Sequence, residues 1–393
     1  MIIYVSSGTS YCIYNKHYDD GKICCGQQAQ KFNNLLINGL AEHTKVISVA
    51  VMPFDEKKYV HTKRECIIDG NATFICIPNK PQKLIHKISN MVLTFKEVLK
   101  VCRYNKPSAV ICDSINLSAS FASFNVSKLM RIQRIAIVTD VPEIMCGEKI
   151  PIFMKMTAFL MKRYDAYVLL TKAMNDIVNP KGKPYAIIEG SCQAVNMSAR
   201  QSNSETGKKI CLFSGSMGCD SGLEILVEGF LKANIDNAEL QFYGYGDFVY
   251  KLSAICEKHS NIKYCGTVTN DEIVCKQLKA TLLINPRLST MGYSAYSFPS
   301  KIMEYMASGT PILSTRLSGI PDEYFDYMYT IFDETVDGYK LAFHETLSKS
   351  VEELRYKGEK ARQFVESNKN NVLQANKIKA LIVDTKVDNL WCV

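Results

Sequence analysis

The chain has 393 residues, of which 47% are hydrophobic and 22% are charged. This length is too great for one ordinary domain and predicts two, and the composition excludes a disordered or fibrous protein. The formal net charge of +8 fits nucleic acid, anionic membrane or phosphorylated substrates as partners. Because no block of Lys and Arg is interleaved with aromatic residues, we expect no binding to nucleic acid.

No apolar run is long enough for a transmembrane helix, since charged residues such as Lys96 and Lys155 interrupt the best candidates. Residues 1–5 are apolar and lack a basic leader, so we expect a first β-strand, not an export signal, and a cytoplasmic protein. The 15 cysteines contain no C-x-x-C pair. We therefore expect reduced and mostly buried thiols.

Short apolar runs alternate with segments of helical periodicity, which predicts an α/β protein with parallel sheets. In the first half we expect, in chain order, strand 2–6, helix 27–42, strand 45–51, helix 83–102, strand 109–112, helix 118–131, strand 135–139, helix 151–163, strand 166–170 and strand 185–189. In the second half we expect strand 210–214, helix 223–233, strand 239–243, helix 248–259, strand 262–264, helix 271–278, strand 281–285, helix 301–307, strand 311–314 and helix 339–366.

The polar stretch 199–208 indicates a domain boundary. We expect two doubly wound domains, 1–198 and 199–370, and a final segment, 371–393, whose helix returns to the first domain. Ligands of open α/β sheets bind beyond the carboxyl ends of the strands. An active site is therefore expected in a cleft between two facing domains.

The most informative motif is SFPSKIMEYMASGTPIL at residues 297–313, followed by SGIPDEY at 318–324. Pro299 predicts the start of a helix and Gly309 its end. The free N–H groups and the dipole of such a helix start favour a diphosphate, and Lys301 adds a positive charge. Glu304, one turn further on, can accept hydrogen bonds from ribose hydroxyls. The alternatives are a solvated lysine and a surface acid.

Together with NPR at 285–287, this motif resembles the donor-binding motif of family 4 (group 1) glycosyltransferases, in its bacterial capsular and exopolysaccharide variant. LFSGS at 212–216, GLEIL at 222–226, FYGYG at 242–246 and IVTDVP at 137–142 are similar to that subgroup as well. The resemblance implies a GT-B fold, two Rossmann-like domains facing a cleft. It also implies an enzyme of the EC 2.4 type that transfers a hexosyl or other glycosyl group with retention. The donor would be a nucleotide-diphosphate sugar, and the acceptor a polysaccharide or lipid-linked oligosaccharide.

The resemblance also indicates site residues. The donor-binding candidates are Gly215, Ser216, Gly244, Arg287, Ser300, Lys301, Glu304 and Tyr305. Asp140 and Lys301 are the catalytic candidates, and Asp113 has a position similar to that of Asp140. Gly8 and Gly26 flank the expected acceptor-side loop. The alternatives are a structural salt bridge for Arg287, a helix cap for Asp140 and a plain turn for the two glycines.

The sequence departs from the family pattern at two places. The first glutamate of the usual Glu-x7-Glu pair is replaced by Tyr296, and two cations of the family are replaced by Ser216 and Ser221. A diphosphate in a partly desolvated site needs positive charge, which we expect Arg287 and Lys301 to supply. The losses leave open a catalytically inactive partner subunit. A sugar-nucleotide epimerase or a phosphorylase on the same fold is a further alternative.

The six histidines show no metal-ligand spacing. We expect neither a metal nor a cofactor, the nucleotide sugar being a substrate. Segment 151–163 combines apolar residues with Lys155, Lys162 and Arg163. This mixture is typical either of a helix on an anionic membrane surface, near a lipid-linked acceptor, or of a core helix with flanking lysines.

Overall fold

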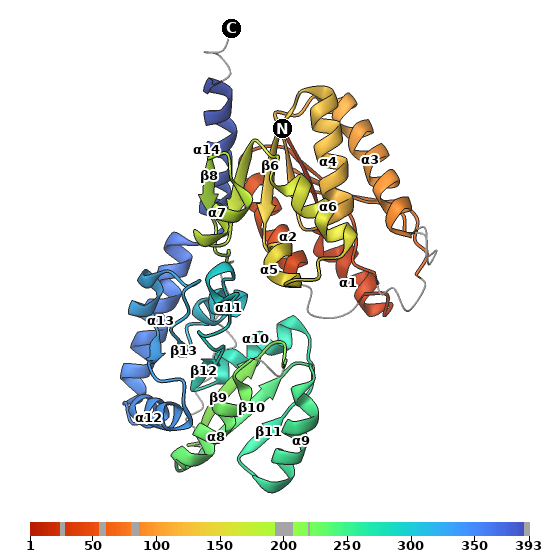
Figure 1. Cartoon of the computed structure of the whole chain (residues 1–393). Helices are drawn as coiled ribbons and strands as arrows, with labels where there is room; N and C mark the ends of the chain where they lie inside the picture. The colour runs from red at the N-terminus through yellow and green to blue at the C-terminus, as the bar shows by residue number, and fades with distance from the viewer. Residues whose placement is uncertain (24–27, 55–59, 80–85, 193–206, 219–220, 389–393) are drawn as a thin grey trace. The chain divides into compact units, whose positions relative to one another are not determined.

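The computed structural model describes residues 1–23, 28–54, 60–79, 86–192, 207–218 and 221–388. The chain divides into two compact units, Met1–Ser191 with Asn371–Val393, and Cys192–Asn370. Each unit contains one sheet with helices packed against it, which is the expected Rossmann-like α/β arrangement (Figure 1). The expected boundary between residues 198 and 199 lies outside the described residues.

The first unit has its strands in the order β3-β4-β2-β1-β5-β6-β7-β8. They are β1 (Ile2–Ser6), β2 (Val46–Ala50), β3 (Glu65–Asp69), β4 (Ala72–Cys76), β5 (Ala109–Asp113), β6 (Gln133–Val138), β7 (Ala166–Leu169) and β8 (Tyr185–Ile187). Neighbouring strands are parallel except for β3 and β4. This antiparallel hairpin was not predicted from the sequence. The sequence feature that indicates this hairpin is the Gly70-Asn71 pair between two runs of β-forming residues. In the structure Gly70 has a φ of 56°, as such a turn requires.

Helices of the first unit are α1 (Tyr11–Asp19), α2 (Gln28–Ala41), α3 (His86–Asn105), α4 (Leu117–Met130), α5 (Pro142–Cys146), α6 (Ile152–Met161), α7 (Ala173–Val178) and α14 (Asn371–Asp388). The last helix packs against α2 and β8, although it follows the whole second unit in sequence (Figure 1). Its Ala375 and Ile378 are fully buried in one core with Leu36 and Ile37. A Cβ at Gly39 would lie 2.2 Å from the carbonyl oxygen of Asn371, so the α2 backbone meets this helix directly.

The second unit has a wholly parallel sheet in the order β11-β10-β9-β12-β13-β14. Its strands are β9 (Lys209–Ser214), β10 (Ala238–Tyr243), β11 (Ile262–Tyr264), β12 (Leu282–Asn285), β13 (Ile312–Thr315) and β14 (Tyr329–Ile331). Successive strands are added on one side of β9 and then, from β12 onward, on its other side. The carboxyl ends of β9 and β12 therefore flank the topological switch point, where open α/β sheets bind ligands.

Helices of the second unit are α8 (Leu223–Ala233), α9 (Phe248–Lys258), α10 (Asn270–Lys279), α11 (Ser300–Ser308), α12 (Val336–Leu347) and α13 (Val351–Asn368). The prediction of one helix over 339–366 was wrong, because the chain forms two helices there. Ser350 Oγ accepts a hydrogen bond from Glu353 N at 3.1 Å, and the Glu353 carboxylate accepts one from Ser350 N at 3.0 Å. This capping box starts a new helix at Val351.

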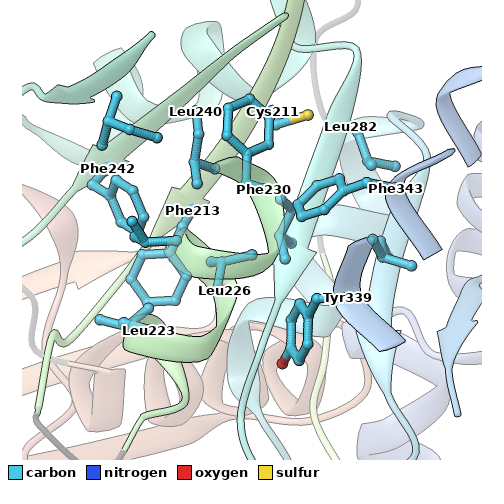
Figure 2. Close-up of a cluster of buried hydrophobic side chains, with 14 of the residues drawn as sticks. Cys211, Phe213, Leu223, Leu226, Phe230, Leu240, Phe242, Leu282, Tyr339 and Phe343 are labelled. Atoms are coloured by element: carbon cyan, nitrogen blue, oxygen red, sulfur yellow. The ribbon is translucent and has the colours of Figure 1, made fainter. Parts of the chain in front are cut away.

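The core of the second unit lies between the sheet and α8 and α12 (Figure 2). Phe230 and Phe343 meet edge to face with ring centroids 5.2 Å apart. The ring centroids of Phe213 and Phe242 are 5.9 Å apart. Burial of each such ring stabilises the fold by about 1.5–3 kcal/mol. Phe213 lies one residue before the end of β9, so this core also fixes the strand end that carries Gly215.

The cysteines differ in burial. Cys76, Cys112 and Cys211 are buried, whereas Cys12, Cys66 and Cys275 are exposed, so the thiols are less uniformly buried than expected. The cysteines in the described ranges are all free thiols. Burial raises the pKa of the Cys211 thiol to about 12, which keeps it neutral and unreactive.

Candidate functional site

Lys301 lies in the first turn of α11, with its ammonium against the end of β9. Nζ is 3.8 Å from the centroid of the Phe213 ring, and a Cβ built on Gly215 would lie 3.0 Å from Nζ. Burial, followed by the positive charge of Arg287, lowers the pKa of Lys301 to about 7, against the opposing effect of Glu304. An anion beside this ammonium would favour its protonated form.

Arg287 follows β12 and reaches the segment that leads into α11. Its Nη1 donates a hydrogen bond to Ser297 Oγ at 3.1 Å, and the guanidinium carbon is 5.6 Å from the centroid of the Tyr293 ring. Pro299 precedes the helix, and no side chain caps its start. Two cations and the positive end of a helix dipole therefore gather at the switch point of the second sheet, which is an arrangement suited to a diphosphate.

Two glycines allow the loops after β9 and β10 to meet backbone to backbone. Gly215 and Gly244 have φ angles of 140° and 141°, in a region that favours glycine. A Cβ on Gly244 would lie 1.9 Å from the carbonyl oxygen of Gly215. The N–H of Gly215 donates to the carbonyl of Tyr243 at 2.9 Å. Side chains at either position would disturb the loop beside Lys301.

Glu304 is partly buried one turn after Lys301, and a buried amide holds its carboxylate. Gln277 Nε2 donates to Glu304 Oε1 at 2.6 Å and to Ser214 Oγ at 3.2 Å. Sequence reasoning missed Gln277, which lies among charged residues near the end of α10. The only signal was its place beside Leu278 on what proves to be the buried side of that helix.

Tyr305 was expected to bind the donor, and the structure places it beneath the site. The side chain is fully buried, and its hydroxyl accepts a hydrogen bond from Ser214 N at 2.9 Å. Burial raises the pKa of this hydroxyl well above its usual value. Tyr305 thus anchors α11 to the end of β9. Ser216 and Ser300 are exposed at the same sheet edge.

Two carboxylates lie at the carboxyl edge of the first sheet. Asp140 is exposed just after β6, and Asp113, at the end of β5, is 2% exposed. Burial raises the pKa of Asp113 to about 6; a hydrogen bond from Asn33 opposes this shift, and the charge of Asp140 adds to it. Tyr4 fixes Asn33 through a hydrogen bond of 2.8 Å from its hydroxyl to Oδ1. Asp113 is therefore a buried carboxyl with a raised pKa, although the sequence favoured Asp140 as the functional residue.

Gly8 lies in the loop after β1, packed against α2. A Cβ there would lie 2.8 Å from Asn33 Cβ and 2.9 Å from Ile37 Cδ1. Its N–H donates to Ser6 Oγ at 2.8 Å, and Ser48 Oγ donates to its carbonyl at 2.8 Å. These contacts make Gly8 a close-packing residue of the loop. Gly26 lies outside the described residues.

Helix α6 has a buried face and an exposed apolar face. The exposed side chains are Ile152 at 67%, Phe153 at 36%, Met156 at 38% and Phe159 at 57%, and these four residues are called the α6 apolar face below. Lys155 and Arg163 are exposed beside it, with the Arg163 guanidinium 3.4 Å from the centroid of the Phe159 ring. A core helix with flanking lysines would bury such aromatic residues.

The described part of the chain offers neither a metal-binding cluster nor a membrane-spanning helix. Its histidines, cysteines and carboxylates form no group of three or more that could hold a metal ion. Among the same residues, no helix combines the length and apolar character that crossing a membrane requires.

Comparison with known proteins gives a family match in the second unit. Residues 208–342 match the family model of glycosyl transferases group 1. No curated protein sequence matches the chain.

Solved structures resemble the whole chain. Sucrose-phosphate synthase from Thermosynechococcus elongatus has a TM-score of 0.71 and 12% identity, over 98% of this chain and 100% of that chain. The UDP-forming α,α-trehalose-phosphate synthase from Burkholderia xenovorans, in complex with glucose-6-phosphate, has a TM-score of 0.69 and 9% identity. The match covers 97% of this chain and 100% of that chain. The Anabaena protein HepE, in complex with UDP, has a TM-score of 0.65 and 10% identity. The match covers 98% of this chain and 99% of that chain.

These likenesses concern the fold, and the family match concerns the unit that carries Lys301. The match ends before α13 and covers Arg287, Lys301 and Glu304. The enzyme class that it indicates is glycosyl transfer, EC 2.4. The chain therefore has the GT-B fold of two Rossmann-like domains, and its residues 208–342 match the family of group 1 glycosyl transferases.

Proposed function

We propose that the protein transfers a sugar from a nucleoside-diphosphate sugar to a glycan acceptor. The observation that carries this proposal is the pairing of Lys301 and Arg287 at the uncapped start of α11, on the switch point of the second sheet. The diphosphate binds between these cations and the helix N–H groups. Glu304 accepts hydrogen bonds from the ribose. Gly215 and Gly244 provide the backbone surface beside the phosphates, with Ser216 and Ser300 at its rim.

In this proposal the protein acts by holding positive charge beside the diphosphate, where the bond between the sugar and the nucleoside diphosphate breaks. As the glycosidic bond cleaves, negative charge develops on the departing nucleoside diphosphate, and protonated Lys301 and Arg287 stabilise it. No protein nucleophile is needed, and the anomeric configuration is retained. Asp140, with Asp113 beside it, orients acceptor hydroxyls at the edge of the first sheet. Neither a metal nor a cofactor takes part.

The acceptor that we propose is a polysaccharide or a lipid-linked oligosaccharide at the cytoplasmic face of a membrane. The α6 apolar face supports this, because exposed aromatic and aliphatic side chains flanked by Lys155 and Arg163 suit an anionic lipid surface. The net charge of +8 favours the same partner. The protein would then lie on the membrane without crossing it.

A turnover assay tests the proposed activity. The purified protein is incubated with UDP-, GDP-, ADP- and dTDP-sugars, with and without a lipid-linked glycan extract, and the released nucleoside diphosphate is measured. We expect release with one donor class, strong dependence on the extract, and loss in Lys301→Ala. Absence of release with every donor would support a non-catalytic partner subunit. Release of an isomerised nucleotide sugar without acceptor would support an epimerase.

Vesicle sedimentation tests the membrane contact separately. We expect the protein to sediment with phosphatidylglycerol-containing vesicles and to remain in solution with phosphatidylcholine alone. Replacing Phe153 and Phe159 with Ser should abolish sedimentation. Leu129→Asn is the matched control, because Leu129 is 64% exposed on α4, outside the α6 apolar face. Equal sedimentation of all variants would contradict a role of this face.

A further inference from the structure

Gln277 is a buried amide that joins three parts of the second unit. Its side chain is 0% exposed. From α10, Nε2 donates to Glu304 Oε1 of α11 at 2.6 Å and to Ser214 Oγ at the end of β9 at 3.2 Å. Its backbone carbonyl accepts a hydrogen bond from Thr310 Oγ1 at 2.8 Å. Nε2 therefore ties the side chain to α11 and β9, and the backbone carbonyl ties α10 to Thr310, whereas Oε1 is buried without a hydrogen-bond partner in the described part of the chain.

The orientation of the amide follows from its partners. An ionised carboxylate can only accept hydrogen bonds, so the NH₂ group of Gln277 faces Glu304. The other partner, Ser214 Oγ, lies 3.1 Å from the Tyr305 hydroxyl, which is itself buried. A chain of buried polar groups thus runs from Tyr305 through Ser214 and Gln277 to Glu304.

A glutamate side chain in the second turn of a helix has several rotamers. The short hydrogen bond from Gln277 selects those that keep Oε1 against α10. Lys301 precedes Glu304 by three residues, so both project from the same side of α11. Holding one carboxylate oxygen against α10 consequently fixes where the whole carboxylate lies relative to Lys301 and its proposed diphosphate.

We infer that Gln277 is a positioning residue for the donor: it holds the Glu304 carboxylate where that group meets the ribose hydroxyls. The inference rests on the proposed function and adds to it a residue that contacts no ligand. A purely structural role, in which Gln277 only ties α10 to α11, would weaken all ligands alike. A positioning role acts on the ribose hydroxyls in particular.

The test is a comparison of a nucleotide with its dideoxy analogue across matched variants. Dissociation constants of UDP, GDP, ADP and dTDP and of their 2′,3′-dideoxy analogues are measured by calorimetry for the wild type, Gln277→Met and Thr310→Val. The wild type should bind one of these nucleotides and prefer it over its dideoxy analogue by about tenfold or more, since a hydrogen bond to a charged group is lost without the hydroxyls. Gln277→Met retains the side-chain length but cannot donate, and its preference should fall to about twofold or less. Thr310→Val loosens the same region and leaves the amide, so it should retain the wild-type preference.

Three outcomes would overturn the inference. If Gln277→Met weakens both ligands equally and keeps the preference, Gln277 is only structural. If Thr310→Val loses the preference as well, general loosening explains the effect. If the wild type binds none of the nucleotides or shows no preference, the proposed ribose role of Glu304 itself fails, which distinguishes this case from the other two. Should Gln277→Met not fold, Gln277→Asn takes its place, because the shorter amide stays buried but falls short of Glu304.

Discussion

At the scale of single residues, the charged groups of the second unit could largely be foreseen. Lys301 and Glu304 belong to one continuous motif and Arg287 to the short NPR motif before it, and the structure brings all three to one sheet edge. Gln277 could not be foreseen, because its partners Ser214 and Glu304 are distant in sequence. The burial of Tyr305 was likewise hidden, since a tyrosine in such a motif looks the same whether it lines a site or supports it.

Binding of the donor's nucleoside diphosphate should weaken as the pH rises above 7. The pKa of Lys301 is lowered to about 7 in the free protein, and a bound diphosphate raises it, so binding takes up a proton. Affinity should fall by up to about tenfold per pH unit between pH 7 and 9, as measured by calorimetry. Lys301→Arg keeps its charge throughout and should show a flat profile. An equally flat wild-type profile would contradict the proposed contact.

The Lys301 ammonium also makes the free energy of unfolding depend on pH. In the unfolded chain Lys301 has its ordinary pKa of 10.5, whereas in the folded chain the pKa is about 7. Between these values the unfolded state binds more protons, so the free energy of unfolding should rise with pH in that window. Chemical denaturation of the wild type and Lys301→Met checks this. The Met variant should lack the rise, and an identical pH dependence in both proteins would contradict it.

At the scale of elements, apolar runs predicted the buried parallel strands well, because helices cover both faces of such strands. Two of the failures lie where short-range chemistry overrides periodicity. The turn at Gly70 creates the β3–β4 hairpin, and the capping box of Ser350 and Glu353 separates α12 from α13. Both signals are present in the sequence but are only a few residues long.

Removal of the capping box at the start of α13 should lower the stability of the protein measurably. Ser350→Ala should lower the free energy of unfolding by about 1 kcal/mol, because the first-turn N–H groups of α13 lose their acceptor. Urea denaturation and hydrogen exchange of the α13 amides measure this. Ser348→Ala is the control, since Ser348 Oγ only donates to the carbonyl of Glu345 at 3.2 Å. Equal effects of the two substitutions would contradict the assigned start of α13.

At the scale of the whole molecule, the first unit is discontinuous in sequence. It is completed by α14, which buries Ala375, Ile378 and Leu381 in its core. Composition and alternation indicated two domains. The apolar spacing of the last segment indicated a helix, and its return to the first unit was expected from the resemblance, because periodicity alone cannot show which core a helix joins.

A chain ending at Asn370 should therefore lose stability in the first unit. Removal of α14 exposes its apolar partners on α2 and should cost on the order of 5 kcal/mol. Calorimetry with and without UDP should show a lowered transition for the first unit and a UDP-sensitive transition that is retained. A chain ending at residue 388 is the control and should behave as the full protein. Loss of the UDP-sensitive transition on removal of α14 would contradict the division into two units.

The central claim is that Lys301 and the start of α11 bind the nucleoside diphosphate of a sugar donor. A thermal-shift panel of UDP, GDP, ADP, CMP and dTDP, with and without Mg²⁺, on the wild type and Lys301→Ala tests it most directly. A ligand at about 100 times its dissociation constant adds roughly 2.7 kcal/mol of stability. We predict that one nucleoside diphosphate stabilises the wild type without Mg²⁺ and leaves Lys301→Ala unchanged. A wild type that none of these nucleotides stabilises would contradict the claim.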